Sequence, residues 1–211
     1  MRSGDRSRRR GPDRQRPDHR RTAVAGEAAR IMQEHGVTDF RDAKAKAAER
    51  LGLGKSVPLP TNEEVAAALA ERQRIFQGDT QPELLEALRH AALQAMRELA
   101  EFHPRLTGDV LSGHATEHSG VDLHLFCDTS ELVGSALAAL GLEPHAIDRR
   151  HRFRRDESEP FPGYEFIVDG CECVATVFPL RLRGQAPLSK VDGRPMKRIG
   201  ERELAGMLGV A

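Results

Sequence analysis

The spacing of the apolar residues changes at Pro104, and this change constrains the fold more than any other feature of the sequence. Upstream, between residues 81 and 102, apolar side chains recur three or four positions apart, which predicts an amphipathic helix. Downstream, Val121, Leu123 and Leu125 alternate with polar residues, which predicts a strand with one buried face. A chain that places helices first and strands afterwards belongs to the α+β class.

Further helices are expected upstream of residue 81. Residues 23–36 and 39–52 each end at a glycine, which can adopt the left-handed conformation that closes a helix. Thr61 and Glu64 form a capping box, which starts another helix that reaches about residue 76. We therefore expect an all-helical N-terminal region over residues 23–101.

The downstream part is expected to form a mixed β-sheet with flanking helices over residues 102–180. A strand over residues 105–111 would turn at Ser112-Gly113, and a helix would follow over residues 128–140. Asp169-Gly170 is typical of a tight turn between two strands. The further expected strands and the short helix of the C-terminal tail (residues 181–211) cover residues 144–153, 164–168, 171–178 and 201–208.

The first residues form a basic arm. Residues 1–21 contain nine Arg and three Asp in a chain whose formal net charge is zero. No apolar residue follows Met1 in this segment, so residues 1–22 are expected to be disordered. Such an arm can bind nucleic acid by neutralising phosphates, or it can bind a protein; a plain solubilising tail is the alternative.

The composition also excludes some classes of protein. No run approaches the roughly 18–20 apolar residues of a membrane-spanning helix, and no apolar segment follows the Arg-rich start as in a secretory signal. Cys171 and Cys173 are separated by one residue, and Cys127 makes the number of cysteines odd. This pattern suits reduced thiols, so we expect a cytoplasmic protein without a membrane partner.

The segment over residues 110–126 resembles the signature of the DNA polymerase beta-like nucleotidyltransferase superfamily. Its features are the small turn Ser112-Gly113, a short loop that ends at Ser119, and the strand that contains Asp122. The resemblance extends over residues 102–178 and implies a nucleotidyltransferase-like fold. It also implies a nucleoside triphosphate as ligand or substrate and Mg²⁺ as cofactor, because paired carboxylates of this family bind magnesium ions.

The resemblance assigns roles to individual residues. Asp122 would be the metal ligand and a catalytic residue, and Glu172 would be a second catalytic carboxylate. The phosphates would be approached by Ser112, Gly113 and Ser119, and their charge would be neutralised by Arg149 and Arg152. These two arginines belong to a basic run that is equally typical of an exposed edge strand protected by charge.

The acidic motif is incomplete, which leaves the function open. One alignment places Gly120 in the position of the family's first aspartate, and the other places His124 in the position of the second. Nucleotidyl transfer is therefore expected to be weak or lost. The alternative is a non-catalytic ligand-sensing or interaction module on the same fold.

Two other readings of the polar residues remain open. Three histidines and two acids crowd into a short segment and could hold zinc or another transition metal: His114, Glu117, His118, Asp122 and His124. The simpler interpretation is a polar loop. Lys190 and Arg194 lie in a Pro/Gly-rich tail that could close over a pocket or could merely wrap around the sheet.

Overall fold

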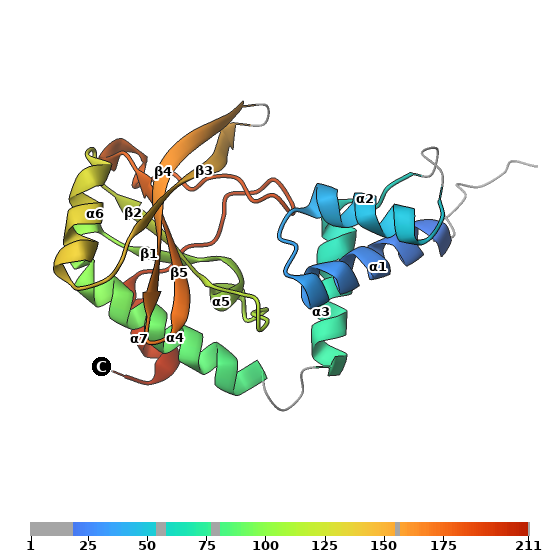
Figure 1. Ribbon diagram of the computed structural model, residues 1–211, viewed down its shortest axis with the longest axis horizontal. Helices are drawn as coiled ribbons and strands as arrows, with labels where there is room; N and C mark the ends of the chain where they lie inside the picture. Colours follow the sequence, from blue (N-terminus) through green and yellow to red (C-terminus); the bar gives the residue numbers. More distant parts are fainter. Residues whose placement is uncertain (1–18, 54–57, 77–80, 155–156, 211) are drawn as a thin grey trace, which may run out of the picture.

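The computed structural model describes residues 19–53, 58–76, 81–154 and 157–210, and it has an α+β fold (Figure 1). Within these residues, seven α-helices and one five-stranded mixed sheet are present. The predicted basic arm lies outside the described residues as far as residue 18, and the first helix starts at His19, ahead of the predicted residue 23. None of the described helices combines the length and the apolar character that crossing a membrane requires.

The first three helices form a body of their own: α1 (His19–His35), α2 (Phe40–Arg50) and α3 (Asn62–Phe76). Their shared core is small, and several of its buried residues are alanines, such as Ala28, Ala43 and Ala47, which allow helices to approach closely. The predicted capping box at the start of α3 is confirmed. The amide of Glu64 donates to Thr61 Oγ1 at 3.2 Å, and the amide of Thr61 donates to Glu64 Oε2 at 2.6 Å.

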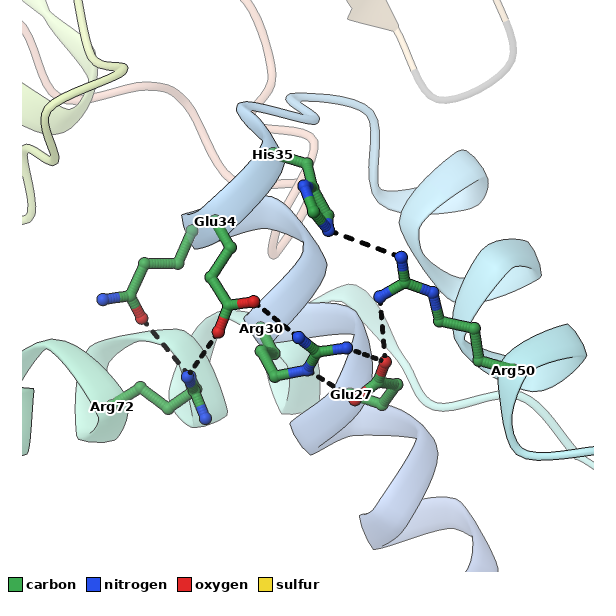
Figure 2. A network of polar contacts seen from close by, with 7 residues as sticks. Glu27, Arg30, Glu34, His35, Arg50 and Arg72 are labelled. Atoms are coloured by element: carbon green, nitrogen blue, oxygen red, sulfur yellow. Dashed lines mark hydrogen bonds and ion pairs between the residues drawn. The ribbon is translucent and has the colours of Figure 1, made fainter.

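Charged side chains link these helices on their surface (Figure 2). Glu27 accepts hydrogen bonds from Arg30 and from Arg50, which lies on α2. Glu34 accepts from Arg30 and from Arg72, which lies on α3. Because most of these side chains remain partly exposed, each pair adds little to the stability of the fold.

The rest of the chain builds the sheet, whose strands lie in the order β1-β2-β5-β4-β3. Their bounds are β1 (Arg105–Thr107), β2 (Val121–Phe126), β3 (His145–Arg154), β4 (Glu157–Val168) and β5 (Cys171–Phe178). β2 pairs with β5 in parallel, and all other pairs are antiparallel. The parallel pair is possible because α6 (Ser130–Ala139) and the β3–β4 hairpin supply the long connection between its strands.

The two faces of the sheet differ. The core face carries buried apolar residues such as Leu123, Leu125 and Ala175, which pack with the buried residues of α4 (Gln81–Glu98) and α6 in the main hydrophobic core. Alternate residues of β2 and β5 point to the other side, which we call the open face. It carries Asp122, His124, Phe126, Thr176 and Phe178.

The C-terminal segment between β5 and α7 (Glu201–Leu208) crosses the open face. Thr107 Oγ1 donates to the carbonyl of Lys197 at 3.0 Å, and Arg198 lies 5.5 Å from the ring centre of Phe126. Farther out, a loop of this segment reaches the helical body (Figure 1), where Asn62 Nδ2 donates to the carbonyl of Lys190 at 2.5 Å. The segment therefore connects the two bodies of the protein.

Several sequence predictions are confirmed and others are wrong. The Asp169-Gly170 turn has φ values of 49° and 78°, as a tight hairpin turn requires, and α7 covers the predicted residues 201–208. The predicted strand over residues 105–111 is wrong because β1 ends at Thr107, where Gly108 turns the chain into α5 (Gly108–Ser112). Ser112-Gly113 is consequently the end of a helix and not a turn between strands.

Candidate functional site

Asp122 lies on the open face of β2, where Arg149 binds it. Arg149 Nη2 donates to Asp122 Oδ1 at 3.1 Å, and the Asp122 side chain remains 39% exposed. Arg149 belongs to β3, at the far edge of the sheet from β1, and two strands, β5 and β4, lie between β3 and β2. It reaches Asp122 because the β3–β4 hairpin curves back over the open face.

A glycine turn presses against the same carboxylate. Gly108 has a φ of +75°, and a Cβ atom built on it would lie 2.9 Å from Asp122 Oδ2. Both the backbone conformation and the close approach therefore require glycine at this position. The turn places the first residues of α5, including Asp109, beside Asp122.

Two carboxylates and two cations determine the electrostatics of the site. The surrounding chain segments displace water from Asp122 and raise the pKa of its carboxyl group, while Arg149 and Lys190 oppose this rise. Loss of water also raises the pKa of Asp109, and the negative charge of Asp122 raises it further, although His114 opposes the rise. The site thus combines an acidic pair with Arg149 and Lys190.

Two neutral histidine rings, those of His124 and His151, lie near the carboxylates on the open face. His124 is only 2% exposed, so the prediction of a half-buried strand is wrong at this residue. Its ring centre lies 5.4 Å from that of His151 and 4.8 Å from that of Phe178. Burial lowers the pKa of His124 well below its ordinary value and lowers that of His151 to about 4, with help from nearby cations. Both rings are therefore uncharged at pH 7.

Three of the predicted phosphate-binding residues serve local structure. Ser112 Oγ donates to the carbonyl of Asp109 at 3.2 Å, and Gly113 closes α5 with a φ of 82°. The end of a helix presents carbonyl oxygens, which repel phosphate, so this turn is poorly suited to the predicted role. Ser119 Oγ accepts from the amide of Thr116 at 2.9 Å within the loop that precedes β2.

Glu172 lies on the open face of β5, but it is exposed and two residue pairs along the strand from Asp122. Asp122 pairs with Val174, so Glu172 lies beside Gly120. A Cβ atom on Gly120 would lie 2.8 Å from the carbonyl oxygen of Glu172. The close approach of these two backbones favours glycine at position 120.

The structure separates the two predicted arginines. Arg149 contacts Asp122, whereas the described contact of Arg152 is made by its carbonyl, which accepts from the amide of Leu188 at 2.6 Å. Lys190, which the sequence suggested as part of a lid, influences both Asp122 and His151. The positive charge at the site therefore comes from Arg149 and Lys190.

The described residues support only a limited metal site. They include no group of three or more His, Cys, Asp or Glu side chains arranged to hold a metal ion, so the alternative of a zinc site at residues 114–124 is wrong. Mg²⁺ typically binds one or two protein carboxylates together with substrate phosphates, so Asp122 and Asp109 would be the carboxylates that hold a single such ion. They do not fit a pair of such ions.

The sequence alone did not indicate all residues of the site. Gly108 and Asp109 come directly after Leu106 and Thr107, and a shorter predicted strand would have identified this Gly-Asp pair as a turn. No local sequence pattern indicates that His151 belongs to the site, because the tertiary fold of the β3–β4 hairpin brings it there. It lies 3.3 Å from Thr176 Oγ1, on a strand that follows it in the sequence.

Comparisons with known proteins give little further information. No protein family matches the sequence, and no curated protein is similar to it. Among solved structures, one similar chain comes from a study of the activity of a cytoplasmic RNA terminal U-transferase. The two chains are 20% identical with a TM-score of 0.30, and the match covers 46% of this chain and 28% of the other.

Proposed function

We propose that this protein is nucleotidyltransferase-like and binds a nucleoside triphosphate with one Mg²⁺ ion at Asp122, with nucleotidyl transfer weak or lost. The observation that carries the proposal is the convergence of Asp122 and Asp109 at the Gly108 turn, opposite Arg149 and Lys190. An acidic pair that can hold Mg²⁺ beside two cations suits a magnesium–triphosphate complex.

Each residue has a defined role in this proposal. Asp122 and Asp109 would hold the ion, and the ion would neutralise part of the triphosphate charge. Arg149 and Lys190 would bind phosphate oxygens, Arg149 by exchanging its contact with Asp122 for one with the ligand. The absence of a side chain on Gly108 allows the start of α5, and with it Asp109, to approach Asp122 closely. Glu172 is the next carboxylate along the open face, and it would assist only after a change of side-chain position.

Weak or lost transfer follows from the acids that are missing. Transfer with two metal ions requires several carboxylates that bridge the pair. Gly120 cannot be exchanged for an acid without moving the backbone of Glu172, and Asp122 already binds Arg149. The site supports binding of a charged ligand better than it supports the chemistry.

A specific contact favours a second candidate, a non-catalytic ligand-sensing module. The side chain of Lys190 acts on Asp122, while its carbonyl accepts a hydrogen bond from Asn62 of the helical body. A ligand that moves Lys190 would therefore alter the connection between the two bodies. The basic arm over residues 1–22 could bind a nucleic acid or a protein partner. If the partner is a nucleic acid, binding should weaken steeply with salt and disappear on deletion of the arm.

Calorimetric titration with magnesium-ATP and magnesium-GTP tests the proposal. The wild-type protein should release or absorb heat with at least one nucleotide, and Asp122→Asn should remove this signal. Asp148→Asn is the matched control, because Asp148 is an exposed aspartate next to Arg149 on β3. When the nucleotide titration is repeated in the presence of excess EDTA, which removes Mg²⁺, nucleotide binding to the wild type should weaken.

The outcomes separate the candidates. Binding lost in Asp122→Asn but retained in Asp148→Asn supports the site. Incubation with radiolabelled nucleotide should then give no product or slow transfer. Absence of heat with both nucleotides, in protein that circular dichroism shows to be folded, would contradict nucleotide binding at Asp122.

A further inference from the structure

A second group of cations lies away from Asp122, around a cavity of about 380 Å³ between β1, the end of α4 and the start of α7. Its basic lining consists of Arg97, His103, Arg105 and Arg183, and the only carboxylate that lines it among the described residues is that of Glu201. Glu201 Oε1 already accepts a hydrogen bond from Arg97 Nε at 3.1 Å. The cavity therefore carries an excess of positive charge.

Arg105 is held in place by the backbone rather than by an acid. A Cβ atom on Gly200 would lie 2.5 Å from Arg105 Nη1, so the guanidinium packs directly against this glycine at the start of α7. None of the described residues supplies a carboxylate to Arg105 or to Arg183. These two guanidinium groups keep hydrogen-bond donors for a ligand.

A fourth guanidinium, that of the partly buried Arg198, increases the positive potential. Arg198 Nη2 donates to the carbonyl of Arg183 at 3.3 Å, and Arg198 Nη1 is buried without a hydrogen-bond partner among the described residues. Burial lowers the pKa of Arg198, and the charge of Arg105 lowers it further. Like charges placed this close repel one another, and an anion in the cavity would relieve the repulsion.

We propose that this cavity binds a small phosphate-bearing anion through Arg105 and Arg183. Planar guanidinium groups bind phosphate oxygens in pairs of parallel hydrogen bonds, which favours phosphate over a monovalent anion such as chloride. Arg97 stays with Glu201, and Arg198 contributes charge. The site does not depend on nucleotide binding at Asp122, because it shares none of the residues assigned to that function.

Titration of inorganic phosphate and of tripolyphosphate, followed by calorimetry in a phosphate-free buffer, tests this site. Arg183→Gln and Arg105→Gln should each weaken binding about tenfold. Arg202→Gln is the matched control, because Arg202 is exposed on α7 and does not line the cavity. Asp122→Asn should leave phosphate binding unchanged, which distinguishes this site from the proposed nucleotide site.

Thermal unfolding provides a second measurement. Phosphate should raise the melting temperature of the wild type, and Arg183→Gln should reduce this stabilisation whereas Arg202→Gln should retain it. Arg183 is exposed, so this variant is expected to fold. Equal phosphate affinity in the wild type and in Arg183→Gln, or an equal loss in Arg202→Gln, would overturn the proposal.

Discussion

The carboxylate of Asp122 and the guanidinium of Arg149 form an ion pair at 3.1 Å on the open face of the sheet. The two residues come from strands that are not neighbours, so the pair depends on the curvature of the β3–β4 hairpin. The surrounding residues also determine the protonation state of Asp122. Lost water favours the neutral form of Asp122, whereas Arg149 favours the charged form.

Substitution of Arg149 tests this balance. Arg149→Gln should raise the pKa of Asp122 further above its ordinary value, because the closest positive charge is removed. Since both side chains are more than a third exposed, the free energy of unfolding should change by less than about 1 kcal/mol. Carbon-13 NMR titration of the aspartate carboxyl groups measures the pKa. Arg154→Gln, at an exposed position of the same strand, should leave the pKa unchanged.

An acid introduced at position 120 should damage the fold rather than create activity. Gly120→Asp places a Cβ atom 2.8 Å from the carbonyl oxygen of Glu172, so two paired backbones must separate. Overpacking of this kind lowers the free energy of unfolding by about 1–3 kcal/mol. Urea denaturation of Gly120→Ala beside Gly184→Ala isolates the effect, because a Cβ atom on Gly184 has nothing within 4 Å. Equal stability of the two variants would contradict this account.

The two neutral histidines should make the fold sensitive to acid. The pKa of His151 is lowered to about 4 in the folded protein, below the ordinary value of 6.5 that the unfolded chain retains. The unfolded state therefore binds more protons between pH 6.5 and about 4, and the stabilisation present above pH 6.5 is lost as the pH falls through this window. The loss from His151 should reach about 1.4 kcal/mol per pH unit.

Denaturation curves at several pH values measure this dependence. His151→Gln should flatten the decline between pH 6.5 and 4, although His124 contributes a further part of it because its pKa is also lowered. His145→Gln is the control, because His145 is exposed on the same strand. If the two variants flatten the dependence of the unfolding free energy on pH to the same extent, this result would show that burial of His151 does not cause the dependence.

Phe178 should be among the most costly core residues to truncate. It is fully buried, and its ring lies within about 6 Å of those of Phe126, Phe153, Phe161 and His151. Phe178→Ala should lower the free energy of unfolding by about 3–5 kcal/mol in urea denaturation. Leu180→Ala, at a nearby position that is 46% exposed, should change it by about 0.5 kcal/mol or less.

Local sequence patterns predicted most of the elements. Helical spacing located α4, the capping box located the start of α3, and the Asp169-Gly170 turn located the β4–β5 hairpin. The failure at residues 108–112 has a physical reason. Val110 and Leu111 suit a strand as well as a short helix, and only the turn at Gly108 decides between them.

The site was predicted less completely than the fold. Asp122 and Arg149 were both named from the sequence, and the structure brings them into contact. Asp109 was missed because its position depends on where β1 ends. Whether Ser112, Gly113, Ser119, Arg152 and Glu172 bind a ligand stays a prediction, although Ser112 and Gly113 lie at a helix end that does not favour phosphate.

The sequence by itself determined the α+β order, the helical first part and the alternating strand that carries Asp122, because caps, turns and apolar periods act over a few neighbouring residues. Only the tertiary structure decided that β2 pairs with β5, that Gly108 touches Asp122 and that Arg149 and His151 return over the open face. These contacts join residues far apart in the chain. They depend on how the whole sheet curves and packs, which no local pattern records.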